Sequence, residues 1–124
     1  MAKIFLIIGS TLGGLSVAIG AFGHALKNIL EANDRMHTFE TGVKYQFYHA
    51  LALILLGLLM QKFDHKLFVW SGYGFIIGTI LFSGSLYILS LSGIGKWGAV
   101  TPLGGVAYLV GWITLVIGIN LSST

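Results

Sequence analysis

The sequence contains no cysteine, which excludes a disulfide framework, a thiolate metal site and a cysteine nucleophile. Charge is also scarce: Asp, Glu, Lys and Arg make up 9% of the 124 residues, whereas an average soluble domain carries about 25%. Hydrophobic residues make up 56%, and the mean hydropathy is +0.89. This composition is typical of a chain solvated mostly by lipid. We therefore expect a single membrane domain over residues 1–124.

The few charges lie near the ends of apolar stretches. The net charge is +3, and the seven Lys and Arg residues flank the segments predicted to cross the membrane. That placement suits contact with anionic lipid headgroups. It does not form a basic stripe of the kind that binds DNA. We expect the lipid bilayer as a partner and no nucleic acid.

Four stretches are long enough to cross a bilayer, because a helix needs about 20 residues to span roughly 30 Å of hydrocarbon. The predicted spans are about 4–23, 43–60, 67–91 and 102–120. The segment between the first two, 24–40, carries most of the charge, yet its apolar residues recur at near-helical spacing. It is either a short interfacial helix or a solvated connector. Thr101 is predicted to cap the last span, with Pro102 at the first helical position.

Three of the spans carry small residues at alternating spacings of three and four. In the first span these are Gly9, Gly13, Ser16, Gly20 and Gly23. In the third they are Ser71, Gly74, Gly78 and Ser85, with Leu81 in the gap, and in the fourth Gly104, Ala107, Gly111, Thr114 and Gly118. Helices in lipid associate by close backbone approach, which such seams permit. The sequence thus predicts an all-α integral membrane protein with four transmembrane helices in a compact bundle. More seams than one four-helix core can use would predict a homo-oligomer or a larger membrane complex.

An even number of spans places both termini on one side of the membrane. Lys3, Lys62 and Lys66 lie on that side, against four basic residues on the other. The first three flank their spans closely, so we expect cytoplasmic termini.

The second span has a polar face. Tyr45, Gln46 and His49 share one side of a helix at about 100° per residue, and the opposite side is purely apolar. Within a span, an ionisable residue is a functional hypothesis by default. His49 is thus predicted either to gate, shuttle protons or bind a metal, or to hydrogen-bond a neighbouring helix as a neutral side chain and fix its register. Trp112 lies too deep for an interfacial belt, and we expect it in the core or on a partner surface.

Several short motifs resemble one known family. They are Gly20-Ala21-Phe22-Gly23 followed by His24-Ala25-Leu26, Tyr45-Gln46 with His49-Ala50, residues 81–87 (LFSGSLY), and Thr101-Pro102-Leu103-Gly104-Gly105 ending near Gly111-Trp112. In this order they are similar to the small bacterial membrane proteins of the domain of unknown function 423, the YgdD-like family. This chain has one alanine fewer before His24 than the family pattern, which turns His24 by about 100° relative to the glycine stripe. The resemblance implies a multi-pass protein of the bacterial cytoplasmic membrane and supplies no established enzymatic activity.

Three functions remain open. The first is a non-enzymatic structural, stabilising or assembly component that acts through helix contacts, with no catalytic residue, metal or cofactor. The second is a small-solute or lipid transporter that uses the polar face around His49, although all four acidic residues are predicted in connectors. The third is a cofactor or metal site held by His24 and His49.

Overall fold

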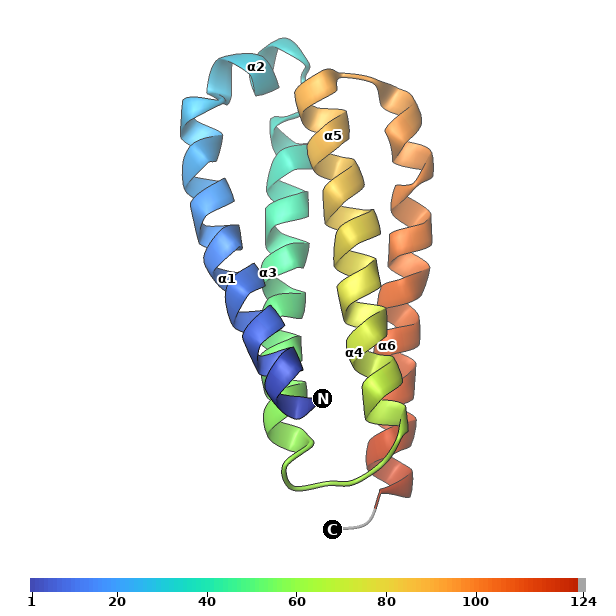
Figure 1. Ribbon diagram of the computed structural model, residues 1–124. Helices are drawn as coiled ribbons and strands as arrows, with labels where there is room; N and C mark the ends of the chain where they lie inside the picture. Colours follow the sequence, from blue (N-terminus) through green and yellow to red (C-terminus); the bar gives the residue numbers. More distant parts are fainter. Residues whose placement is uncertain (123–124) are drawn as a thin grey trace.

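A computed structural model describes residues 1–122 of the chain, and almost all of them are helical (Figure 1). The elements are α1 (Ala2–Ala25), α2 (Lys27–Ala32), α3 (Met36–Leu59), α4 (Leu67–Gly78), η1 (Thr79–Ser83), α5 (Gly84–Ser92), η2 (Gly95–Ala99) and α6 (Thr101–Leu121). Four helical segments are long and apolar enough to cross a membrane, and α4, η1 and α5 together form the third of them. The protein is an all-α integral membrane protein with four spans, as predicted.

The four spans are arranged so that two are central and two are peripheral (Figure 1). α1 packs mainly on α3, α3 packs on the third span, and the third span packs on α6. Half of the most apolar window of the third span and 44% of that of α3 are buried, against 17% for α1 and 22% for α6. α1 and α6 therefore offer most of their surface to lipid or to a partner. The ends of α1 and α6 that carry the chain termini lie at the same end of the bundle.

The connector between the first two spans is more ordered than a solvated loop. The short helix α2 follows α1, and its Leu30 is fully buried. α3 begins at Met36, earlier than the predicted start at 43, because Phe39 and Gly42 extend its buried face. The turn between α2 and α3 is tied to the end of α5, since the Asn33 side-chain Nδ2 donates to the carbonyl oxygens of Ser90 and Leu91 at 2.9 and 3.2 Å.

The third span differs from the single continuous helix expected over 67–91. Residues Thr79–Ser83 form a π-helical turn, which adds a residue to the turn and shifts the register that follows. The shift buries Ser83, whereas Leu81 is only partly buried. Ser83 Oγ then donates to the carbonyl oxygen of Gly42 at 2.8 Å. The local register follows this contact with α3 rather than an unbroken heptad.

The small residues of the first span face α3. A Cβ added to Gly9 would lie 2.8 Å from the carbonyl oxygen of Ala50, and one added to Gly23 would lie 3.0 Å from the Phe39 ring. Gly13 and Gly20 face Ala50 and Val43 less tightly, and Ser16 is buried with its hydroxyl bonded to the carbonyl oxygen of Leu12. At the other end of α1, the Phe5 ring fills the space above Gly72 of α4.

The seams of the third and fourth spans face each other. A Cβ added to Gly74 would lie 2.8 Å from the Gly111 backbone and from the carbonyl oxygen of Ala107. Gly78 lies against the Tyr108 ring, Gly118 against Phe68, and Gly104 against the backbone of Phe82. Hydroxyl pairs add to this contact: Ser71 with Thr114 at 2.9 Å, and Ser85 with Thr101 at 2.6 Å.

The predicted role of Thr101 as an N-cap is wrong. Val100 holds the cap position and α6 begins at Thr101, so Pro102 is the second helical residue rather than the first and still lies in the first turn. The Thr101 hydroxyl bonds to Ser85 across the helix interface instead of to its own backbone.

Two neighbouring glycines of α6 test the importance of close approach. Gly104→Ala is expected to destabilise the bundle by about 1–3 kcal/mol, because the new methyl group would overlap the Phe82 backbone and force the helices apart. Gly105→Ala is the matched control, since a Cβ there meets nothing within 4 Å. Equilibrium unfolding in mixed SDS micelles, followed by near-ultraviolet circular dichroism, measures both. Equal stability of the two variants would contradict the argument.

Candidate functional site

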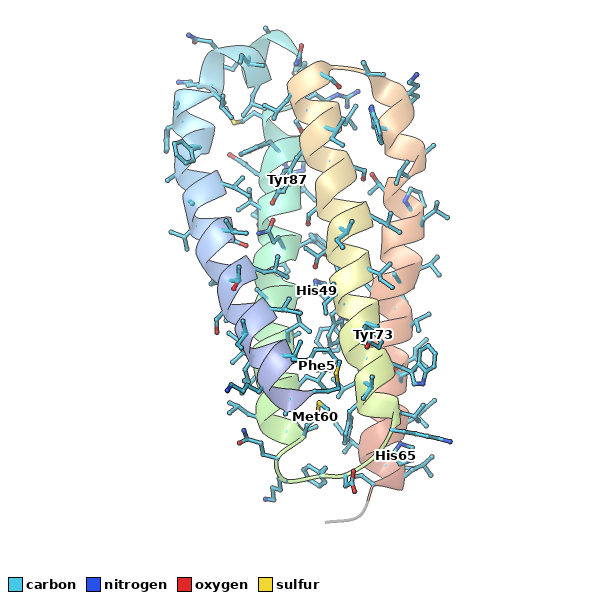
Figure 2. The ribbon with its side chains drawn as sticks, in the orientation of Figure 1. Phe5, His49, Met60, His65, Tyr73 and Tyr87 are labelled. Atoms are coloured by element: carbon cyan, nitrogen blue, oxygen red, sulfur yellow. The ribbon has the colours of Figure 1, made fainter. Side chains whose placement is uncertain are left out.

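His49 lies near the middle of α3 and is almost completely buried. Figure 2 shows it in the interior of the bundle, between α3 and the third span. Its ring stacks on Tyr108 of α6 with centroids 3.5 Å apart and planes at 7°. Phe75 of α4 and Trp112 of α6 contact it from other sides. The imidazole is thus surrounded by aromatic rings from two other helices.

The hydrogen bonds of His49 define its tautomer. Nδ1 lies 2.8 Å from the carbonyl oxygen of Tyr45, and Nε1 of Trp112 lies 3.0 Å from Nε2. A carbonyl oxygen only accepts and an indole N–H only donates, so Nδ1 carries the proton and Nε2 accepts. Both nitrogens of the neutral ring are therefore used. A protonated ring would set two N–H donors against each other at Trp112.

Tyr108 extends this contact towards the π-helical turn. Its hydroxyl donates to Thr79 Oγ1 at 3.1 Å, and Thr79 in turn donates to the carbonyl oxygen of Phe75 at 2.9 Å. The π-helical turn thus places a buried hydroxyl where the Tyr108 phenol can reach it. His49, Tyr108, Trp112 and Thr79 form what we call the histidine cluster.

Gln46, one turn before His49, joins three helices. Its Nε2 donates to the carbonyl oxygen of Leu12 on α1 at 3.0 Å, and its Oε1 accepts from the Tyr87 hydroxyl of α5 at 2.6 Å. Figure 2 shows Tyr87 inside the bundle, further than His49 from the end that carries the chain termini. Because donors and acceptors are scarce in lipid, these bonds fix how far α1 and α5 slide along α3.

A shallow groove of about 430 Å³ opens beside the histidine cluster, between α3 and α6. Tyr45, Phe82 and Trp112 line it together with Pro102 and the apolar side chains of α6, and His49 and Tyr108 form part of its wall. Tyr45 and Trp112 are partly exposed here, at 38% and 42%. The groove is lined mainly by aromatic and apolar side chains, and both nitrogens of His49 are engaged in the hydrogen bonds described above.

The structure does not bring His24 to His49. His24 is exposed beside Gly23, which lies level with Phe39. Residues 39 and 49 of α3 are separated by about 15 Å along the helix axis. One haem or metal ion cannot be held by both imidazoles at that separation. Within residues 1–122, no three His, Cys, Asp or Glu side chains are grouped as metal ligands.

Sequence reasoning identified Tyr45, Gln46 and His49 but not their partners on other helices. Tyr108 and Thr79 were not singled out, and Trp112 was placed only in the core or on a partner surface. The four-residue spacing of Ser83 and Tyr87 is the available signal in the third span, since both side chains reach α3. No spacing within one helix identifies a partner on another.

A protein-family model described as "Protein of unknown function (DUF423)" matches residues 19–105. The inner membrane protein YgdD of Escherichia coli K12, named UPF0382, is 42% identical over 118 residues, covering 94% of this chain and 89% of the relative. The UPF0382 membrane protein YwdK of Bacillus subtilis is 42% identical over 117 residues, covering 93% and 94%. A UPF0382 membrane protein of Staphylococcus epidermidis is 39% identical over 116 residues. No solved structure matches the chain significantly.

The bond between His49 and Trp112 can be measured with a double-mutant cycle. His49→Phe and Trp112→Phe each remove one partner and keep an aromatic ring. Their coupling energy is expected to lie between about 0.6 and about 1.7 kcal/mol, the average and the maximum of double-mutant cycles on interhelical hydrogen bonds in a membrane protein. The unfolding assay described for Gly104 measures it. Trp70→Phe is the control, because Trp70 is 61% exposed and should not couple to His49. Strict additivity of His49→Phe and Trp112→Phe would show that the bond contributes nothing.

Proposed function

This chain belongs to the DUF423 family, whose relatives are membrane proteins, and on that premise we propose that it is a non-enzymatic accessory or assembly component of the bacterial cytoplasmic membrane. It acts through helix–helix contacts made by the outer face of α1. The observation that carries the proposal is a second stripe of small residues on α1. The stripe consists of Ser10, Gly14, Ala18, Ala21 and Ala25.

The outer stripe is distinct from the inner seam of α1. At 100° per residue it is turned about 140° away from the seam that faces α3. All five of its residues are exposed, and a Cβ added to Gly14 meets nothing within 4 Å. Large apolar side chains suffice for contact with lipid. Small residues three and four apart favour close approach by another helix instead.

The inner seams are already occupied within the chain. The glycines of α1 that face inwards lie against α3, and those of the third span and α6 lie against each other. A homo-oligomer or larger complex that formed through these residues would first have to separate the bundle. The outer face of α1 has no such conflict, so it is the surface to which we assign a second copy or another membrane protein.

The histidine cluster supports a structural part for His49 rather than a part in transport. A transport site needs a side chain that exchanges a ligand or proton during each cycle. Both nitrogens of His49 are engaged within the bundle. Trp112, whose indole N–H donates to Nε2 of His49, also lines the groove. A solute could reach Nε2 of His49 only by taking the place of the Trp112 indole there.

The chain has no cysteine, so an introduced residue is the only thiol of the chain that a cross-linker can reach. Ala21→Cys is expected to form a cross-linked adduct with a bifunctional maleimide or a mild oxidant in native membranes. Val116→Cys, on the outer face of α6 and 67% exposed, is the control and should remain uncross-linked. An adduct of twice the chain mass identifies a second copy, and any other mass identifies a different protein. The absence of any adduct from Ala21→Cys would refute the proposed surface.

Gly14→Leu separates association from folding. Open space surrounds Gly14, so this variant should keep the stability of the native chain while its cross-linking through Ala21→Cys falls about tenfold, the effect of some 1.4 kcal/mol. Gly9→Leu is the matched comparison and should unfold more easily, because a side chain there meets the Ala50 carbonyl. Undiminished cross-linking of Ala21→Cys in the chain that also carries Gly14→Leu would count against a helix contact at this stripe.

A further inference from the structure

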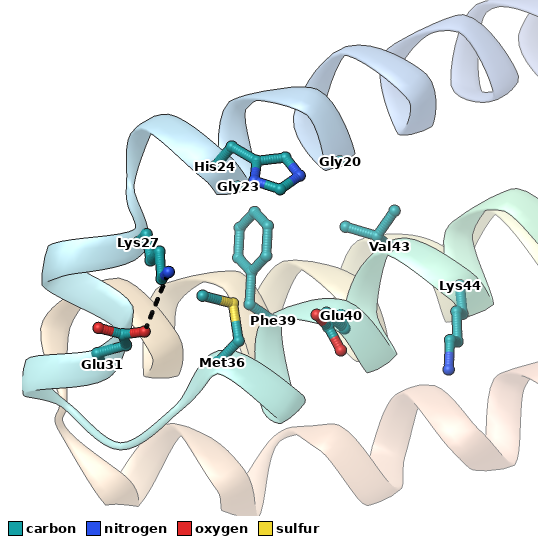
Figure 3. Close-up of a pocket in the computed structure, with 10 residues that line it drawn as sticks. All are labelled: Gly20, Gly23, His24, Lys27, Glu31, Met36, Phe39, Glu40, Val43 and Lys44. Atoms are coloured by element: carbon teal, nitrogen blue, oxygen red, sulfur yellow. Dashed lines mark ion pairs between the residues drawn. The ribbon is translucent and has the colours of Figure 1, made fainter.

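A second hollow lies at the opposite end of the bundle from the chain termini. It is an open hollow lined by the end of α1, by α2 and by the start of α3, and its volume is about 450 Å³ (Figure 3). Cavities of about 300–1,000 Å³ are the usual size of small-molecule sites. None of the residues of the histidine cluster contributes to it.

The floor of this hollow is apolar. Figure 3 shows the Phe39 ring directed from α3 towards Gly23 and His24, with Met36 beside it. Val43 continues the floor along α3, opposite Gly20. The space exists because α1 has glycine at both positions that face this surface. A methylene chain fits such a floor, and a fully hydrated polar ligand does not.

The rim carries charges of both signs. Lys27, Lys44 and His24 supply nitrogen donors, and Glu31 and Glu40 supply carboxylates. The Lys27 ammonium lies 3.8 Å from Glu31, but both side chains are well exposed, at 60% and 57%. Such a surface pair is worth little and exchanges readily for another partner. Within the described chain, Glu40 and Lys44 form no ion pair.

The position of the hollow along the helices matches the boundary of the hydrocarbon. α1 ends at Ala25 and α3 begins at Met36, so the rim lies where the spans leave the membrane. Glu40 is close to that end of α3. Lys44 is one turn deeper, where its long side chain can reach back to the headgroups. The apolar floor therefore lies at the depth of the upper acyl chains.

We propose that this hollow binds a zwitterionic phospholipid whose headgroup carries a primary amine, that is, a phosphatidylethanolamine. Lys27 and Lys44 hold the phosphate, Glu40 accepts hydrogen bonds from the ammonium group, and an acyl chain lies over Phe39 and Val43. This site does not depend on the helix contacts assigned to the outer face of α1.

The charges of the rim select among lipid classes. A headgroup with only negative charge would find Glu31 and Glu40 beside its phosphate, and like charges repel. A choline headgroup has no N–H to donate to Glu40, and a quaternary ammonium favours a cage of aromatic rings. The residues that line the hollow offer no such cage: their aromatic rings are the imidazole of His24 on the rim and the phenyl ring of Phe39 on the floor. A primary ammonium instead has three N–H donors that match carboxylate acceptors.

Native mass spectrometry of the full-length chain in a mild detergent tests the assignment. The added lipids share the same acyl chains and differ in headgroup: phosphatidylethanolamine, its mono- and dimethylated forms, phosphatidylcholine and phosphatidylglycerol. Apparent affinity should fall stepwise as N–H donors are removed, by about tenfold from ethanolamine to choline, as loss of charge-assisted hydrogen bonds predicts. Equal binding of ethanolamine and choline lipids, or preference for phosphatidylglycerol, would overturn it.

Two further comparisons locate the site and the source of the ligand. Glu40→Gln should remove most of the preference for ethanolamine over choline, whereas Asp64→Asn, an exposed carboxylate at the other end of the bundle, should keep it. The same loss in both variants, or in neither, would refute the site. Free O-phosphoethanolamine shares the headgroup chemistry but has no acyl chain. If O-phosphoethanolamine displaces the bound phospholipid at a concentration similar to that of the phospholipid itself, the ligand is a soluble phosphate ester and the lipid assignment is wrong.

Discussion

The structure depends on how closely the helix backbones approach one another in a solvent that does not drive them together. Lipid chains are as apolar as leucine, so two helices gain little by exchanging lipid for each other unless their surfaces meet closely. Glycine provides that closeness between Gly74 and Gly111 and between Gly104 and Phe82, where a single methyl group finds no room. The same logic applies at Gly72, whose missing side chain is replaced by the Phe5 ring from a different helix. At these three contacts, backbone atoms or an aromatic ring of one helix fill the space that a glycine of another helix leaves free.

Polar contacts complete what the glycines allow. All buried side-chain nitrogen and oxygen atoms in the described part of the chain have hydrogen-bond partners. Unsatisfied polar groups cost several kcal/mol in hydrocarbon, so each such bond also selects one register over its neighbours. Gln46 sets α1 and α5 against α3, and the histidine cluster sets α6 against α3. The polar face of the second span therefore acts as the point where all three other spans are aligned.

Much of the fold follows from patterns within single segments. Span lengths follow from runs of apolar residues, and the small-residue spacing in three spans indicates which sides come together. Three features do not follow from such patterns: the early start of α3 at Met36, the π-helical turn at Thr79–Ser83, and the hydrogen bond to Ser85 that replaces the predicted cap of Thr101. The turn depends on Gly42 of α3, and the position of Thr101 depends on Ser85 of α5. The early start of α3 follows the burial of Phe39, whose ring lies against Gly23 of α1. The candidate site divides similarly: a helical face predicts Gln46 and His49 together, but Trp112 and Tyr108 meet them only through the tertiary arrangement.

The order of the closest contacts has a consequence for how the protein is made. α1 packs on the next span, α3, and the third span packs on the next, α6. Each pair is therefore a helical hairpin of consecutive segments with its own glycine contact, and the ribosome delivers one complete hairpin before the other. The first hairpin can assemble inside the bilayer while the second is still being synthesised, since folding during synthesis runs in chain order. Tyr87, Trp112 and Ser83 then supply the hydrogen bonds by which the second hairpin joins the first.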